Sequence, residues 1–226
     1  MCGRFAFYSA HEAMPALFDV ANPLAIEASY NIAPTDRAAV FRLDDTGQRL
    51  SVSLLRWGLI PFWAKEPSIG NKLINARAET AHQKPAFRAA YRQRRCLIPV
   101  DGFYEWCVGE SGKRPYYISA ANGEAFCFAG LWESWKPAGA DESTETFTIL
   151  TRSPNDYISK LHKRMPVIVD PANFKDWLSG ACGLEHEDAA LPVTPNDALV
   201  ARPVSRQVNS PRNNGPDLIQ EVDEAV

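Results

Sequence analysis

A series of short apolar runs, separated by turn-forming residues, limits the folds open to this chain. The runs are rich in the β-branched and aromatic residues that favour strands, and turn signals such as "DDTG", "GESGKRP" and "ANGE" lie between them. They read "CGRFAF", "AAVFRL", "LSVSLLRW", "RCLIPV", "GFYEWCV", "PYYIS", "AFCFAGLW", "TFTILT" and "MPVIV". Because they do not alternate regularly with helical segments, a doubly wound parallel sheet is disfavoured. We predict an α+β fold in which a mostly antiparallel sheet curls toward a barrel with flanking helices.

Helical segments are fewer and lie between these runs. The pattern predicts helices over 11–19, 79–91, 154–159 and 171–178. In the last of these, Pro171 takes an early helical position and Asp170 is the predicted N-cap. After Ser179 the chain becomes acidic and irregular, before a last strand near "ALVARPVS". A length of 226 residues suits one compact domain, which we expect to span 2–220, followed by a short acidic tail at 221–226.

Composition excludes several classes of protein. The five cysteines are odd in number and form no C-x-x-C pair, so a disulfide framework and a zinc site are disfavoured, and we expect no metal and no cofactor. No apolar run approaches the ~18 residues of a membrane span, and the N-terminus lacks a signal-peptide pattern. We therefore expect a cytoplasmic protein, nucleoid-associated in a bacterium, with no membrane partner and with reduced cysteines.

The net charge of −3 conceals a segregation of charge along the chain. Between Arg56 and Arg95 lie nine basic and two acidic residues, a net charge of +7, which leaves −10 for the remainder. A basic face on an acidic body attracts polyanions such as nucleic acid. The alternative explanation for part of this charge is a solvated helix surface around "AFRAAYRQRR".

Cys2 directly follows the initiator methionine in "MCGRFAF". Methionine aminopeptidases generally remove Met1 when the next residue is small. The mature chain would then begin with a residue that carries a thiol and an α-amine on adjacent carbon atoms. The alternative is a buried cysteine in a first strand, because Cys also packs as a small hydrophobic residue.

Three further residues are candidates for chemistry. Asn75 lies where the apolar run of "LINARAET" enters a helix, and His162 lies at the edge of the apolar strand in "KLHKRMPVIV". Glu105 in "GFYEWCV" shares a strand face with Phe103 and Cys107, so its carboxyl is either half-buried with a raised pKa or paired with a cation. Each also has a structural explanation: a helix cap for Asn75, an ion pair for Glu105 and a surface imidazole for His162.

Motifs along nearly the whole chain resemble those of one family. They are "MCGRF", "YNIAPT", "RWGLIPFWAK", "LINARAET", "RCLIPVDGFYEW", "FAGLWE", "LHKRMPVIV" and "PVSRQVNSPRNNGPDLI", between residue 2 and about residue 220. Their order is similar to that in the SRAP family, the SOS-response-associated, abasic-site-processing proteins of bacteria and eukaryotes. In that family the mature N-terminal cysteine crosslinks to the aldehyde of an abasic site in single-stranded DNA. The resemblance places this cysteine at Cys2.

The resemblance also implies roles for other residues. The catalytic group would be Cys2, Asn75, Glu105 and His162. The DNA-binding residues would be Arg4, Arg77 and Arg164 at phosphates, Asn31 in "YNIAPT", and an apolar wedge of Pro34, Phe62 and Trp63 against which bases stack. The family often has an acid after its histidine, whereas this chain has Lys163, so that acid's role in orienting His162 is absent here.

The function that the resemblance implies is covalent capture of abasic sites during the response to DNA damage, by a monomer with lyase-like chemistry that removes its own Met1 as a thiol peptidase would. An N-terminal aminothiol suits an aldehyde, because the amine forms a Schiff base and the thiol then closes a thiazolidine ring. Three alternatives remain open from the residues alone. They are an N-terminal-cysteine amidotransferase or glutaminase, a thiol peptidase using Cys2, Glu105 and His162, and a non-covalent single-stranded DNA-binding module.

Overall fold

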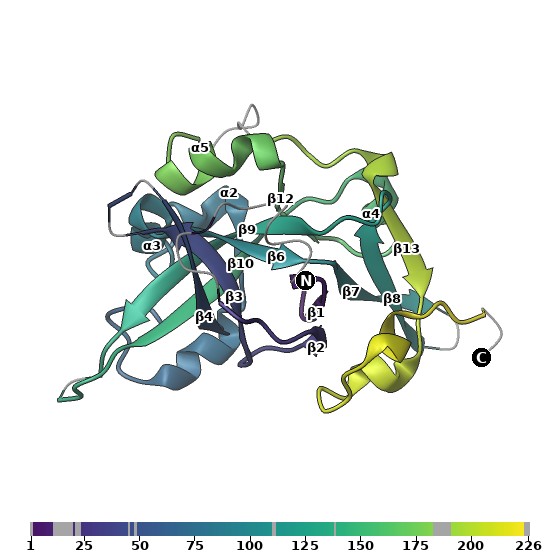
Figure 1. Ribbon diagram of the computed structural model, residues 1–226, viewed down its shortest axis with the longest axis horizontal. Coiled ribbons are helices and arrows are strands. Elements are labelled where there is room, and N and C mark those ends of the chain that lie inside the picture. Colours follow the sequence, from purple (N-terminus) through teal and green to yellow (C-terminus); the bar gives the residue numbers. More distant parts are fainter. Residues whose placement is uncertain are drawn as a thin grey trace.

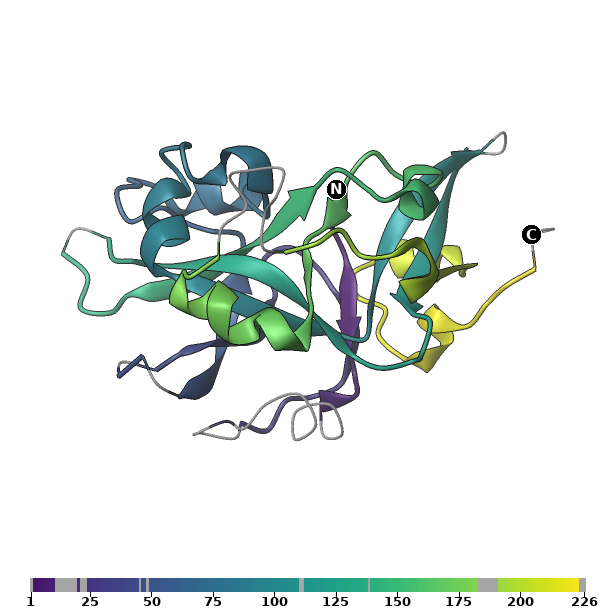
Figure 2. The ribbon, with the colours of Figure 1, turned by 90° about the horizontal axis from the view of Figure 1, so that it is seen from above.

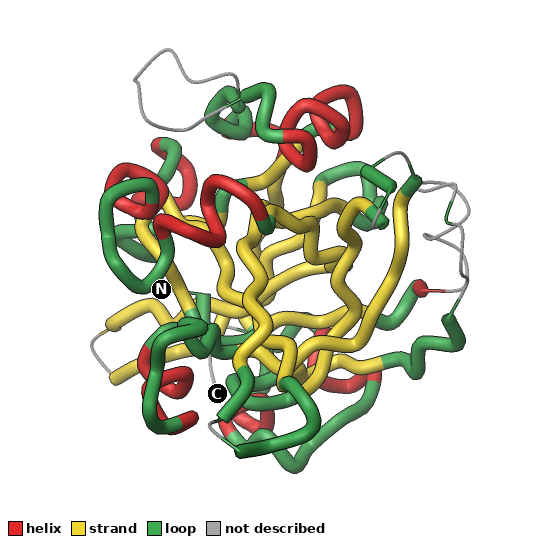
Figure 3. The backbone as a smooth tube through the Cα atoms, turned by 90° about the vertical axis from the view of Figure 1, so that its left-hand side faces the viewer, coloured by secondary structure: helices red, strands yellow, loops and turns green. Residues whose placement is uncertain are grey.

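A closed barrel of five strands forms one half of the protein in the computed structural model (Figure 3). The structure describes residues 2–10, 20, 24–44, 46–47, 49–109, 112–137, 139–182 and 191–223. The barrel strands are β3 (Arg37–Leu43), β4 (Leu50–Trp57), β6 (Arg95–Val100), β9 (Phe126–Trp135) and β10 (Thr144–Arg152). Neighbours pair in the order β4-β3-β6-β9-β10, and β10 closes the ring by pairing with β4. All these pairings are antiparallel except β10–β4, so the predicted antiparallel, barrel-like fold is confirmed.

An antiparallel five-stranded sheet stands beside the barrel. Its order is β13 (Leu199–Pro203), β8 (Gly112–Ala120), β7 (Gly102–Gly109), β1 (Phe5–Phe7) and β2 (Ser29–Ile32). The chain passes from β6 of the barrel to β7 through the single residue Asp101. Only glycine fits at position 102, because a Cβ there would collide with the Tyr117 ring of β8. Strand β1 pairs with β7 and lies between the barrel and the β7–β8 hairpin (Figures 1 and 2).

Aromatic rings join the two halves into one core. Phe5 of β1 packs on Trp57 of β4, with ring centroids 5.1 Å apart, and meets Phe128 of β9 at 6.4 Å. Trp57 in turn stacks on Phe147 of β10. All four side chains are fully buried. Because β1 contributes to the barrel core and to the neighbouring sheet, the chain forms a single domain.

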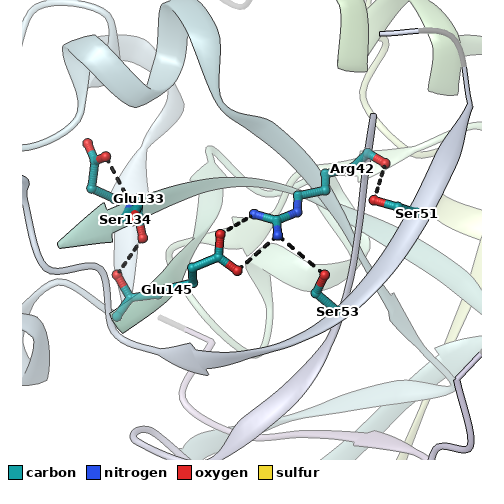
Figure 4. A network of polar contacts seen from close by, with 7 residues as sticks. Arg42, Ser51, Ser53, Glu133, Ser134 and Glu145 are labelled. Carbon is teal, nitrogen blue, oxygen red and sulfur yellow. Dashed lines mark hydrogen bonds and ion pairs between the residues drawn. The ribbon is translucent and has the colours of Figure 1, made fainter. Parts of the chain in front are cut away.

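A polar cluster lies on the barrel strands β3, β4, β9 and β10 (Figure 4). The Arg42 guanidinium of β3 donates to both carboxylate oxygens of Glu145 on β10, at 2.7 and 2.9 Å. It also lies 4.1 Å from the centroid of the Trp132 ring of β9. Three barrel strands are thereby tied together by one cation, a bidentate arrangement with good geometric specificity.

The helices are shorter than predicted. In place of one helix over 79–91, the structure has α2 (Ala78–Ala81) and α3 (Arg88–Gln93), so that prediction is wrong in its middle. Pro85 explains the break, because proline lacks the N–H of an α-helix and disfavours helical geometry in the residue before it. The predicted helix at 154–159 appears as α4 (Asp156–Ser159). The predicted helix over 11–19 lies outside the described residues.

Asp170 caps the next helical segment as expected. Its carboxylate accepts from the Ala172 amide at 2.9 Å, and η2 (Pro171–Asn173) continues into α5 (Phe174–Ser179). Helix α5 covers β6, and the Trp177 indole donates to the Cys96 carbonyl at 2.9 Å (Figure 1).

The remaining elements are short. The run "MPVIV" divides into β11 (Met165–Pro166) and β12 (Ile168–Val169), which pair with different barrel strands. The others are η1 (Pro67–Lys72), β5 (Asn75–Arg77), η3 (Asn196–Ala198), η4 (Arg206–Asn209) and η5 (Pro216–Ile219). The first residues of the expected tail bind the second sheet, since Val222 donates to the Pro203 carbonyl at 3.0 Å. Among the described helices, none has the length and apolar character needed to span a bilayer.

Candidate active site at the amino terminus

Cys2 lies at the junction of the barrel and the second sheet, just before β1. Strand β1 pairs with β7 in the register Phe5↔Phe103, and the Tyr104 amide donates to the Arg4 carbonyl at 2.9 Å. This antiparallel register carries the residues before Phe5 alongside Glu105. The Cys2 side chain is completely buried, and its Sγ lies 3.8 Å from the Arg4 carbonyl oxygen. Cys2 is therefore buried, as expected of a packing residue, and it also lies at the position expected of the reactive N-terminal cysteine.

Asn75 holds the backbone of Cys2. Its side-chain amide donates to the Cys2 carbonyl at 2.7 Å. Asn75 begins β5, which pairs in parallel with β10 at Ile149, just beyond the point where β4 leaves β10 at Phe147. The Asn75 side chain is thus aimed by a short strand that replaces β4 along the edge of β10. The predicted transition from strand to helix at this residue is confirmed, since α2 begins at Ala78.

Glu105 and His162 lie next to each other in the site. Glu105 Oε1 lies 3.6 Å from His162 Nδ1. The Glu105 side chain is 4% exposed and that of His162 26%, so the carboxyl is enclosed while the imidazole reaches solvent. Burial raises the pKa of Glu105, and nearby positive groups, His162 among them, act in the opposite direction. Of the two alternatives expected for Glu105, burial with a raised pKa is present, and an imidazole lies beside the carboxyl.

The alternation that places Glu105 is also confirmed. Phe103 packs in the main core with Cys2, whereas Tyr104 packs in a separate small core with Tyr117 on the other face of β7. Cys107 continues the Glu105 face, and its Sγ approaches the Lys160 carbonyl at 3.9 Å, beside the turn that leads to His162. A period of two along β7 therefore places the carboxyl on the face of the strand that packs with Cys2.

The protonation of Cys2 follows from its surroundings. Burial raises the pKa of the Cys2 thiol far above its ordinary value, and the negative charge of Glu105 raises it further. The thiol is therefore protonated at neutral pH and needs a base before it can act as a nucleophile. The carboxyl whose charge Cys2 senses is available to take that proton. The site thus combines a buried, protonated thiol with a carboxyl whose charge acts on it.

His162 is positioned by backbone groups on both sides. Its own amide donates to the Ile158 carbonyl of α4 at 2.9 Å, and α4 is capped by Asn155, whose side chain accepts from the Ile158 amide at 2.8 Å. Its Nδ1 lies 2.9 Å from the Arg164 carbonyl oxygen and 3.1 Å from the Arg164 amide nitrogen. The first contact requires a protonated Nδ1 and the second an unprotonated one.

Two of the predicted DNA-binding residues lie in a buried network instead of on the surface. The Arg4 guanidinium donates to Asn31 Oδ1 and to the Val208 carbonyl, each at 2.7 Å. Asn31 is 3% exposed, and its amide donates to the Ser210 carbonyl at 3.0 Å and to the Asn213 carbonyl at 2.7 Å. These contacts tie β1 and β2 to the C-terminal segment seen beside them in Figure 1.

The predicted wedge is exposed on a rigid turn. Phe62 and Trp63 are 57% and 49% exposed, which argues against the core packing that such residues usually adopt. The turn is anchored on both sides, since the Ile60 amide donates to the Thr146 hydroxyl at 2.9 Å and the Trp135 indole donates to the Ala64 carbonyl at 2.7 Å.

Pro34 belongs to a neighbouring turn. The Thr35 amide donates to the carbonyl of Trp57, the last residue of β4, at 2.9 Å. Because the wedge turn follows the end of β4 and β5 begins beside it, Pro34, Phe62, Trp63 and Asn75 all lie at one end of the barrel. The predicted wedge thus lies at the same end of the barrel as Asn75.

The other predicted arginines differ in their environments. Arg77 is exposed at the N-terminus of α2. Arg164 forms a bidentate ion pair with Glu79, at 2.6 and 2.8 Å. Sequence reasoning missed Glu79, because nothing in the spacing of "NARAET" indicates a partner 85 residues away. A hollow of about 490 Å³ between β8, β9 and β12 contains none of the predicted site residues.

These features define a single-domain protein with a cysteine site at the N-terminus of the chain, beside a small β-barrel. The chain belongs to the SRAP family (SOS response associated peptidase), whose model matches residues 1–211.

Several relatives extend over the whole chain. Abasic site processing protein YoqW of Bacillus subtilis is 40% identical over 226 residues, covering 97% of this chain and 99% of its own length. Abasic site processing protein YedK of Escherichia coli is 30% identical over 230 residues, covering 98% and 100%. A crystal structure of a protein from Bacteroides thetaiotaomicron shares the fold, with a TM-score of 0.81 at 24% identity over 98% of this chain and all of that one. The predicted family is confirmed.

Proposed function

We propose that this protein processes abasic sites in DNA by crosslinking Cys2 to the ring-opened sugar in single-stranded DNA. Membership of the SRAP family and full-length relatives named for abasic-site processing support the DNA-damage role. The observation that carries the covalent mechanism is the meeting of Cys2 with Asn75, Glu105 and His162 at one end of the barrel. A buried thiol next to a carboxyl of raised pKa suits nucleophilic chemistry better than simple packing.

The reaction follows from the two nucleophiles of a mature Cys2. Loss of Met1 frees its α-amine, which has an ordinary pKa of ~7.7–8.0 and is partly unprotonated near neutral pH. The amine attacks the aldehyde carbon of the abasic sugar, and the resulting carbinolamine loses water to give an imine. The Cys2 sulfur then adds to the imine carbon while its proton passes to the imine nitrogen. The products are a five-membered thiazolidine and one water molecule.

The neighbouring residues supply the proton transfers. His162 protonates the ring oxygen of the closed sugar as it opens to the aldehyde. Glu105 removes the Cys2 thiol proton and delivers protons during loss of water, and its raised pKa makes the carboxyl a stronger base than an exposed one. Asn75 does not titrate, and its hydrogen bond to the Cys2 carbonyl holds the amine and thiol in place.

The exposed residues at the same end of the barrel suit unpaired DNA. Phe62 and Trp63 offer aromatic faces on which bases stack, an interaction worth roughly 1–3 kcal/mol per base and tolerant of any sequence. Arg77 belongs to the basic stretch and is exposed for a phosphate contact. We propose that the protein acts as a monomer on single-stranded DNA. We also keep the prediction that it removes its own Met1.

Intact mass spectrometry of the purified protein, before and after incubation with an abasic oligonucleotide, tests the proposal. We expect loss of Met1, and a heat-stable adduct with the mass of protein plus oligonucleotide minus one water. Cys2→Ser keeps the amine but not the thiol, so its adduct should be a hydrolysable imine. An equally stable adduct from N-acetylated protein would refute the thiazolidine.

Two controls separate this function from its alternatives. Glutaminase activity without any adduct would indicate the amidotransferase, and DNA binding that Cys2→Ala leaves intact without any adduct would indicate the non-covalent module. Abasic single strands should react faster than the same lesion inside a duplex, and equal rates would contradict the wedge.

The roles of His162 and Glu105 are distinguished by two aldehydes. His162→Ala should slow the reaction of a closed abasic sugar much more than that of a small open aldehyde. Glu105→Gln should slow both, by up to the ~10²–10⁴-fold of general acid–base catalysis. Each variant's N-terminus is first read by intact mass, because a retained Met1 would itself block the amine. Equal slowing of both aldehydes by His162→Ala would exclude its role in ring opening.

A further inference from the structure

We propose that Glu79 is a positioning residue for the active site: it holds Arg164, and the backbone of Arg164 in turn holds the His162 imidazole. This inference rests on the proposed function, since it assigns to Glu79 a part in orienting the acid that opens the sugar. It also gives Arg164 a different role from the phosphate contact that the family resemblance implies.

The ion pair that begins this chain of contacts is well formed. Arg164 Nη1 donates to Glu79 Oε1 at 2.6 Å, and Nη2 donates to Glu79 Oε2 at 2.8 Å. Nη2 also donates to the Thr151 carbonyl of β10 at 2.5 Å. The Arg164 side chain is only 18% exposed, so the pair is partly shielded from solvent. Burial would raise the pKa of Glu79, but the hydrogen bonds and charge of Arg164 outweigh it, and the pKa is lowered.

The hydrogen bonds of the Arg164 guanidinium leave few of its N–H groups available to a DNA phosphate. A guanidinium grips a phosphate best when two parallel N–H groups point at it. Here both terminal nitrogens of Arg164 are directed at Glu79. A bidentate phosphate contact would therefore require Glu79 to be displaced. The same geometry makes Arg164 an effective anchor between α2, where Glu79 lies, and the end of β10.

The backbone of Arg164 serves His162 in both of its neutral tautomers. When His162 Nδ1 carries the proton, it donates to the Arg164 carbonyl at 2.9 Å. When Nδ1 is unprotonated, it accepts from the Arg164 amide at 3.1 Å. Shifting the proton at Nδ1 converts Nε2 from an acceptor to a donor. A peptide group anchored beside Nδ1 thus holds the ring in the same place in either tautomer.

Glu79 fits this role because it fixes the segment from His162 to Arg164 without itself touching the reacting atoms. His162 and Arg164 lie on the turn between α4 and β11, where no regular strand pairing holds the backbone until Met165 pairs with Arg152. The Arg164 side chain supplies the missing constraint by reaching Glu79 and Thr151. Lys163 stands where relatives of the family often have an acid, so this chain orients His162 without that carboxylate. The resulting prediction is that loss of Glu79 loosens the imidazole.

The experiment compares Glu79→Ala with a matched control, Glu145→Ala. Glu145 also forms a bidentate pair with an arginine, at 2.7 and 2.9 Å to Arg42, but it lies near the start of β10, whereas Thr151, which Arg164 contacts, lies near the end of that strand. Two quantities are measured for each variant: the imidazole ¹⁵N chemical shifts of His162, which report its tautomer, and single-turnover crosslinking of abasic single-stranded DNA at saturating and subsaturating concentrations. The His162 signal among the four histidines is assigned with His162→Gln.

We expect Glu79→Ala to move the His162 shifts toward a tautomer mixture and to slow crosslinking at saturating DNA at least ~10-fold, a part of the full acid–base effect. DNA affinity should not fall, because the Glu79 carboxylate does not bind phosphate and its loss leaves the Arg164 guanidinium free to do so. Glu145→Ala should leave both the shifts and the saturating rate unchanged. Glu79→Gln, which retains one hydrogen bond to Arg164, should fall between wild type and Glu79→Ala.

Two results would overturn the proposal. Unchanged imidazole shifts with an unchanged saturating rate would show that Glu79 does not position His162. Weaker DNA binding with an unchanged saturating rate would show that the pair acts on phosphate binding. If wild-type protein formed no adduct at all, the proposed function would fail, but the imidazole shifts would still report whether Glu79 positions His162.

Discussion

Replacing Asn31 by alanine tests whether this residue contacts DNA or holds the fold together. The Asn31 amide donates to the carbonyls of Ser210 and Asn213, and its Oδ1 accepts from Arg4. Two neutral hydrogen bonds contribute about 1 kcal/mol each, and one to a charged group about 1.5–3 kcal/mol. The variant should therefore lose about 3.5–5 kcal/mol of unfolding free energy, a large fraction of the ~5–15 kcal/mol typical of a domain.

Urea unfolding measures this loss, and hydrogen exchange locates it. We expect the amides of Ser210 and Asn213 to exchange faster, because the segment from 208 to 213 loses its attachment to β2. Asn122→Ala is the matched control, since Asn122 is exposed and bonds only locally, to Glu124. Its unfolding free energy should change by less than ~0.5 kcal/mol.

A different pattern would refute this reasoning. If Asn31→Ala lost less than ~1 kcal/mol while its affinity for single-stranded DNA fell 10-fold or more, Asn31 would be a DNA contact, as the family resemblance implies. The buried network would then be incidental to stability. Affinity is to be measured at fixed salt, because phosphate contacts depend steeply on ionic strength.

Three further predictions concern stability. The pKa of Glu105 is raised in the folded protein, so its contribution to folding stability is present at acidic pH and is lost as pH rises through that pKa. The stability of Glu105→Gln relative to wild type, measured by urea unfolding, should therefore increase from pH 4 to pH 7. A stability difference that does not change with pH would contradict the burial effect. Thr35 adopts φ +81°, a strained conformation for a β-branched residue, so Thr35→Gly should raise stability by about 1 kcal/mol in thermal unfolding, whereas a loss would indicate compensating contacts. The buried Arg95 guanidinium lies 4.5 and 4.6 Å from the ring centroids of Tyr91 and Trp177; Arg95→Met should cost about 2–4 kcal/mol in urea unfolding, and a smaller loss would show that the ring contacts add little.

The elements that the sequence predicted well are those with a local cause. The alternation around Glu105 correctly separated the two faces of β7, because the side-chain period of a strand is independent of its neighbours. Asp170 was correctly assigned as a cap, because its carboxylate reaches an amide two residues later. The helix predicted over 79–91 was wrong because the pattern of apolar residues continues across Pro85, whereas backbone hydrogen bonding does not.

Sequence motifs alone therefore determined the family, the mostly antiparallel fold and the residue types of the candidate site, since each depends on local pattern or on order along the chain. Only the tertiary structure decided which groups meet. The pairing of β5 and β11 with β10 brings Asn75 and His162 to the same end of the barrel, and the β1–β7 register brings Cys2 to Glu105. In the sequence, Arg4 and Arg164 cannot be distinguished from arginines that bind phosphate. Their partners Asn31 and Glu79 are far away along the chain, and only folding joins them.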